Sequence, residues 1–155
     1  MTAWQWVKLV GNFLNLSTLA GALVGVLGRA TFSRGPRGLF FANEYKLGFP
    51  IAGAFTIGNV VLSKHDRTYF DNAALVRHEE RHSWQYFCLL GLPMLPLYVV
   101  GVIVSFLLTG DPASRNPFER MASLKDGGYV ERPIQPIGQT LTQAFSGLRS
   151  RPKGP

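Results

Sequence analysis

Cysteine is almost absent from this chain, and charged residues are scarce. Cys88 is the only cysteine among 155 residues, which excludes a disulfide framework within the chain and agrees with a cytosolic face. Charged residues make up 16% of the sequence, compared with about a quarter in a typical soluble domain. Hydrophobic residues reach 46%, so a chain with the length of a single domain contains an unusual share of apolar material.

Acidic residues are scarcer still, with nine against sixteen basic residues and a formal net charge of +7. The arginines cluster outside two long apolar stretches. No short segment interleaves aromatic and basic residues, as proteins that stack on single-stranded nucleic acid do. We therefore expect membrane lipids, anionic ones in particular, as the partner of the positive charge, and no nucleic acid.

The first apolar stretch, residues 4–28, is long enough to cross a bilayer, which takes about 20 residues per span. Gly21, Gly25 and Gly28 have the small-xxx-small spacing that lets another helix approach closely in lipid. A signal peptide is the rival interpretation, but the positive segment before the stretch is thin and the candidate cleavage site is poor. We expect residues 1–30 to form an uncleaved transmembrane helix, whose glycine-bearing face could join a larger membrane protein complex.

Three arginines lie between residues 29 and 37, directly after this stretch, whereas Lys8 is the only basic residue before it. The positive-inside rule then places the N-terminus outside and the following segment in the cytoplasm. We accordingly predict a protein of the cell membrane.

The middle of the chain predicts mixed structure, so the expected fold class is α+β and mostly helical. Residues 39–46 and 54–63 are rich in Phe, Ile, Val and Thr between Gly- or Pro-bearing breaks, and they predict strands of a small β-hairpin or sheet. Asp71 or Asn72 can cap a helix that runs from residue 73 to about residue 90. A second apolar stretch, residues 89–108, follows at once and is interrupted early by glycine and proline.

The segment His78-Glu79-Glu80-Arg81-His82 matches the pattern H-E-x-x-H on this predicted helix. Two histidines four residues apart lie on one helix face, where both imidazoles can bind one cation. Glu79 lies beside them, near enough to take a proton from a metal-bound water. Zinc in such sites activates water and polarises a carbonyl, so the implied chemistry is hydrolysis of an amide.

A catalytic zinc normally has three protein ligands and an open position. His65, in the polar turn before the helix, is one candidate for the third ligand. Glu119 is the better candidate, because it opens a second short helix 37 residues after His82. Tyr129 and His65 are candidate oxyanion helpers that could donate a hydrogen bond to a developing negative charge.

These residues resemble the gluzincin class of zinc metallopeptidases, in which a glutamate on a later helix completes the site begun by H-E-x-x-H. The chain is especially similar to small bacterial membrane proteins that carry H-E-x-x-H-x-x-Q, an apolar stretch and an N-P-F-E segment. Here Gln85 completes the first pattern, and residues 116–119 match the second. The resemblance covers about residues 54–129 and implies a zincin-like domain. Glu80 and Arg81 depart from it, because active peptidases usually keep these two positions uncharged.

The ligand set restricts the membrane topology. If residues 89–108 crossed the bilayer, Glu119 would emerge on the opposite side from the two histidines and could not share their metal. The break at residues 91–96 favours a helical hairpin that dips into the membrane and returns, which keeps the site cytoplasmic. We therefore expect an anchor at 1–30, a zincin-like domain at 31–130 with a re-entrant hairpin at 89–108, and a flexible tail at 131–155.

Three functions remain open from the sequence. The first is a minimal membrane-associated zinc metallopeptidase, with His78, His82 and Glu119 as ligands and Glu79 as the base. The second is a non-catalytic accessory subunit of a larger membrane complex, with a structural metal site. The third is a peripheral protein that its arginines hold to acidic lipids.

Overall fold

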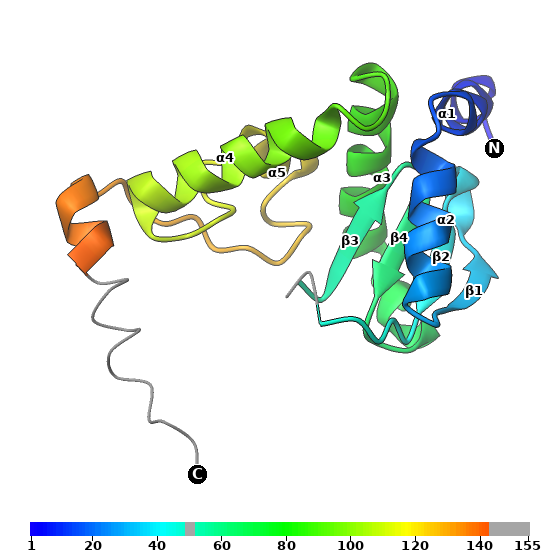
Figure 1. Cartoon of the computed structure of the whole chain (residues 1–155), viewed down its shortest axis with the longest axis horizontal. Coiled ribbons are helices and arrows are strands. Elements are labelled where there is room, and N and C mark those ends of the chain that lie inside the picture. Colours follow the sequence, from blue (N-terminus) through cyan, green and yellow to red (C-terminus); the bar gives the residue numbers. More distant parts are fainter. Residues whose placement is uncertain (49–51, 143–155) are drawn as a thin grey trace, which may run out of the picture. The chain divides into compact units, whose positions relative to one another are not determined.

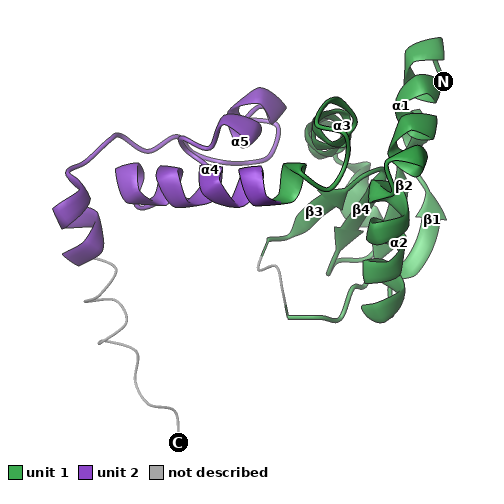
Figure 2. Ribbon diagram, turned by 45° about the horizontal axis from the view of Figure 1, so that its top comes forward, with its two compact units in different colours: residues 1–95 green, residues 96–155 purple. Residues whose placement is uncertain are grey.

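The computed structural model describes residues 1–48 and 52–142, and the chain forms two compact units, residues 1–95 and 96–155 (Figure 2). The structure is α+β with a small mixed sheet, as the sequence predicts.

The sheet lies in the first unit and has four short strands in the order β1-β2-β4-β3 (Figure 1). Its strands are β1 (Thr31–Arg34), β2 (Phe40–Asn43), β3 (Ala54–Ile57) and β4 (Val60–Ser63). β2 and β4 run parallel, while the two outer pairs are antiparallel. β3 therefore forms one edge of the sheet in the part of the chain that the structure describes.

Residues 54–63, expected as one strand, form the hairpin of β3 and β4. Ile57 pairs with Val60, so Gly58 and Asn59 alone make the turn. Gly58 has a φ of +63°, which the first central position of a type II′ turn requires and which glycine adopts without strain. β1 was also missed, because residues 29–37 were considered only for their positive charge.

The sheet is covered on both faces in the first unit. Helix α3 (Ala73–Cys88) covers one face, where the core is built, and α2 (Ser17–Leu27) packs on the other (Figure 1). The core on the α3 face gathers buried apolar side chains from β2, β4, α3 and the segments just before β2 and α3: Leu39, Phe41, Val61, Phe70, Leu75 and Val76. All four residues of β4 are buried, as expected for a central strand that is covered on both faces.

The predicted N-terminal transmembrane helix is wrong as a single element. The structure has two helices there, α1 (Ala3–Leu14) and α2, bent by 70° at the break between them. Asn15 makes the break, because its side-chain oxygen accepts hydrogen bonds from the backbone N–H and the hydroxyl of Ser17, at 3.1 and 2.7 Å. Leu16 between them has a φ of +66°. No single helix in the described ranges is both long and apolar enough to cross a membrane, and the bent pair passes on length and composition alone.

The glycines of α2 lie against the sheet of the same unit. A Cβ at Gly21 would be 2.5 Å from the carbonyl oxygen of Ile57, so only glycine permits this approach. Gly25 similarly lies against Phe32 and Ala42. Packing of α2 on its own sheet thus accounts for the spacing from which we predicted a helix partner.

The helix expected from residue 73 is confirmed as α3. Asn72 caps it by accepting hydrogen bonds from the backbone N–H groups of Ala74 and Leu75, at 3.0 and 3.3 Å. The helix ends at Cys88, and α4 (Met94–Thr109) begins after a turn with Gly91 at a φ of +97°. The predicted break in the second apolar stretch is therefore present.

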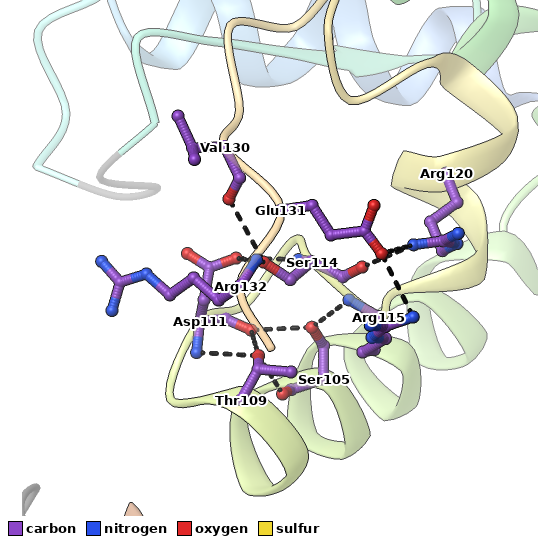
Figure 3. Close-up of polar contacts among 9 residues, drawn as sticks. All are labelled: Ser105, Thr109, Asp111, Ser114, Arg115, Arg120, Val130, Glu131 and Arg132. Carbon is purple, nitrogen blue, oxygen red and sulfur yellow. Dashed lines mark hydrogen bonds and ion pairs between the residues drawn. The ribbon is translucent and has the colours of Figure 1, made fainter. Parts of the chain in front are cut away.

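The second unit begins inside α4 and contains the short helix α5 (Pro117–Ala122). Figure 3 shows the polar network that fixes the loop between them. Asp111 accepts hydrogen bonds from Ser114 at 2.7 and 2.8 Å, and Glu131 forms ion pairs with Arg120 and Arg115 at 2.6 and 3.1 Å. Arg120 in particular lowers the pKa of Glu131. The start of the predicted tail is thus tied to this unit, while residues 143–155 lie outside the described ranges.

Candidate metal centre

Helix α3 places the two histidines of the motif on one buried face. His78 and His82 are 2% and 7% exposed, and their Nε2 atoms are 3.1 Å apart. The spacing of four residues predicts this arrangement on a helix. Both rings therefore turn the same nitrogen to one point, where a single cation can bind.

Gln85 fixes the orientation of His82 from the next turn of α3. The distance between His82 Nδ1 and Gln85 Oε1 is 2.8 Å. Since the amide oxygen only accepts, Nδ1 carries the proton, and the lone pair of neutral His82 is at Nε2. A protein acceptor on the outer ring nitrogen is typical of histidines that bind metals.

Glu79 is buried and is held by the sheet. The hydroxyl of Thr56 donates a hydrogen bond to Glu79 Oε2 at 2.6 Å. Thr56 belongs to the edge strand β3, and it pairs with Val61, which is part of the core beneath α3. Strand alternation thus directs Thr56 to the face that α3 covers. Thr56 was not among the predicted site residues, because nothing in residues 54–57 marks it as a partner of Glu79.

Glu80, one of the two charged residues between Glu79 and His82, has a structural role. Its carboxylate forms an ion pair with Arg37 at 2.7 Å and is almost buried. Lys8 of α1 lies beside it, with its amine 5.7 Å from the centre of the Trp84 ring. Burial lowers the pKa of Lys8 from 10.5 to about 8, and the charge of Glu80 partly opposes this shift. The charged position therefore joins α1, α3 and the turn at Arg37.

Glu119 is buried in the second unit and opens α5. Asn116 caps this helix by accepting a hydrogen bond from the backbone N–H of Phe118 at 3.0 Å, and Pro117 occupies the first turn. Tyr98, on α4, donates a short hydrogen bond to Glu119 Oε1. Tyr98 was not foreseen, because a tyrosine in an apolar helix carries no signal of its partner.

His78, His82 and Glu119 are all buried, and each offers one ligand atom within 4.8 Å of the others. This group could hold a metal ion. Two imidazole nitrogens and one carboxylate oxygen form a donor set that zinc accepts in catalytic sites. Gln85 and Tyr98 are hydrogen-bonded to His82 and Glu119 and orient these two side chains, as the hydrogen-bond partners of metal ligands commonly do.

The two candidate oxyanion helpers, His65 and Tyr129, are not members of the clustered ligand group. His65 stacks on Tyr69 with ring centres 4.3 Å apart and does not belong to the group of three ligands. Tyr129 lies in the second unit, where its backbone N–H donates to the carbonyl of Leu124 at 2.8 Å. Their role as helpers stays a prediction.

No family model, curated protein or solved structure matches this chain.

Proposed function

We propose that His78, His82 and Glu119 bind one zinc ion and that the protein hydrolyses an amide bond, with Glu79 as the general base. The observation that carries this proposal is the buried group of two imidazoles and one carboxylate within 4.8 Å. Two of the three ligands belong to an H-E-x-x-H helix, so these two histidines and the base come from one short segment.

A bound zinc would lower the pKa of its water and polarise the substrate carbonyl. The chain supplies the proton transfer and the alignment. Thr56 bonds Glu79 Oε2, so Oε1 is the oxygen that can receive a proton and later release it to the leaving amine. Because Thr56 lies on a strand, it holds the carboxylate in one rotamer while the proton moves.

The edge strand suggests how a substrate could bind. β3 pairs on one side with β4, and an extended peptide could add to its other side by backbone hydrogen bonds. Thr56 would then lie in the strand next to the peptide, with its hydroxyl on Glu79. A peptide bound in this way is held close to the base.

A structural metal site in an accessory subunit is the second candidate. Burial favours it, because Glu79 is 3% exposed and all three ligands are buried, whereas a catalytic zinc needs an open position. The two candidates share the same ligands. They differ in whether Glu79 performs chemistry.

Metal analysis and an activity assay on matched variants distinguish the candidates. We expect one zinc per chain in the wild type and in His65→Ala, the control for a histidine outside the ligand group, and none in His78→Ala. Glu79→Gln should keep its zinc and lose hydrolysis of an unstructured protein substrate such as casein. Absence of zinc from the wild type would refute both candidates. Zinc bound with no cleavage by the wild type would leave the structural role.

A further inference from the structure

The N-terminal helices have the reverse of the polarity expected for helices on a soluble protein. The inner face of α1 carries Lys8 and Asn12, which are both fully buried. The outer face carries Val10 and Leu14, which are 50% and 78% exposed. A helix on the surface of a soluble domain normally turns its apolar face inward and its polar face to water. In α2 the buried residues are likewise small or polar, and its large aliphatic residues are exposed: Leu19, Leu23, Val26 and Leu27.

The buried amides of Asn12 and Asn59 are well bonded, which fixes the helices in this orientation. Asn59, at the turn between β3 and β4, accepts hydrogen bonds from Asn12 at 3.1 Å and Ser83 at 2.8 Å. It donates to the carbonyl of Leu9 at 3.1 Å and to the hydroxyl of Thr18 at 2.8 Å. All the hydrogen-bonding capacity of this amide is used. Rotation of α1 or α2 to hide the leucines would break this network.

Three exposed leucines, Leu90 and Leu14 among them with exposed fractions of 79% and 78%, meet at one corner of the first unit. Leu14 and Leu16 lie at the bend between α1 and α2, and Leu90 follows α3. The ends of these helices touch, because Asn15 donates to the carbonyl of Tyr86 and an added Cβ at Gly91 would lie 2.7 Å from the Asn15 carbonyl. We call Leu14, Leu16 and Leu90 the leucine corner.

Two residues of the leucine corner adopt a backbone conformation that leucine avoids. Leu16 and Leu90 have φ values of +66° and +57°, and their side chains are 57% and 79% exposed. The left-handed region is unfavourable for residues other than glycine, asparagine and aspartate. Strain of this kind is concentrated at sites with a function. Here the strained residues project apolar side chains outward, so burial in the core does not offset the cost of their backbone conformation.

We propose that the leucine corner and the outer faces of α1 and α2 bind the surface of a bilayer that contains acidic lipids, with the helices lying in the interface. Hydrocarbon is the environment in which polar residues turn inward and leucine turns outward. Exposed Arg29, directly after the end of α2, and the net charge of +7 favour an anionic surface. Both helices are packed on the sheet and α3, so they cannot cross the bilayer without carrying these elements along.

Flotation with sealed, protein-free vesicles tests the proposal. We expect the purified chain to bind phosphatidylcholine vesicles that contain phosphatidylglycerol more strongly than vesicles of phosphatidylcholine alone. The double variant of Leu16→Asn and Leu90→Asn should bind at least about tenfold less, because it loses two apolar side chains. Asparagine tolerates the left-handed conformation, so this variant should melt no lower than the wild type.

Leu47→Asn is the control, since Leu47 is 44% exposed and lies in the segment between β2 and β3. It should float like the wild type. Failure of the wild-type protein to bind protein-free vesicles would refute the proposal, as would a double variant that binds as strongly as the wild type. The first result would leave another protein as the partner of this surface.

Labelling distinguishes helices in the interface from a crossing. In a Cys88→Ala background, Thr2→Cys and Arg29→Cys place one thiol at each end of the helix pair. We expect a membrane-impermeant maleimide, added outside sealed vesicles after binding, to label both variants. Protection of one end alone would show a crossing and overturn the interfacial arrangement.

Discussion

Replacement of Gln85 by leucine is the sharpest test of the metal centre within α3. Leucine has nearly the volume of glutamine but removes the oxygen that accepts the hydrogen bond from His82 Nδ1 at 2.8 Å. His82 and Gln85 are each 7% exposed, so water does not readily replace that oxygen. Partners of this kind typically contribute about 10- to 100-fold to metal affinity, or about 1.4–2.7 kcal/mol. The same range applies to a buried donor that loses its partner, about 1–3 kcal/mol.

The assay is a zinc titration in competition with a chromogenic chelator at constant pH and ionic strength. We expect Gln85→Leu to bind zinc about 10- to 100-fold more weakly than the wild type. Gln85→Glu keeps the acceptor and should bind at least as tightly. Gln139→Leu, at an exposed glutamine, is the matched control and should not change the affinity. Melting curves in excess chelator identify any variant whose fold is altered.

Wild-type affinity in Gln85→Leu, together with loss of zinc in His82→Ala, would refute this reasoning. It would mean that His82 binds the metal without the support of Gln85, and that the hydrogen bond does not select the ring nitrogen.

Three further predictions concern the first unit. Thr56→Val should lower the rate of hydrolysis and leave zinc binding intact. Thr56→Ser should retain the rate, because serine keeps the hydroxyl that donates to Glu79. Equal rates for the two variants would contradict the positioning role of Thr56. Asn59→Ala should lower the free energy of unfolding by about 3 kcal/mol or more in denaturant titrations, because buried partners lose their bonds; a loss below about 1 kcal/mol would be inconsistent with the network. Between pH 8 and 10.5 the unfolded chain binds more protons at Lys8 than the folded chain. The free energy of unfolding should therefore rise with pH in that window, and this rise should be smaller in Lys8→Met.

The motif itself was determined by local sequence. Spacing on a helix fixes the relation of His78 to His82, and Asn72 fixes where that helix begins, so both were predictable from neighbouring residues. The cap before Glu119 was local in the same sense, since Asn116 and Pro117 lie within one turn of it. Short-range geometry decides such features, and it does not depend on what packs around them.

The partners of these residues were decided by tertiary structure. Thr56 reaches Glu79 only because β3 forms an edge of the sheet beneath α3, and no spacing in the sequence encodes that contact. Tyr98 similarly meets Glu119 through the folding of α4 onto α5. Contacts between distant segments depend on how several elements pack at once, which a single pattern of residues cannot specify.

The N-terminal stretch separates most clearly what local sequence determines from what tertiary packing determines. Composition alone established that it is apolar and long enough to span a bilayer, and that much stands. The bend at Asn15, the glycines against the sheet and the buried Lys8 and Asn12 depend on surfaces that other elements supply. Hydropathy measures how much apolar surface a segment has, whereas packing against the sheet and α3 decides which side of the segment faces outward.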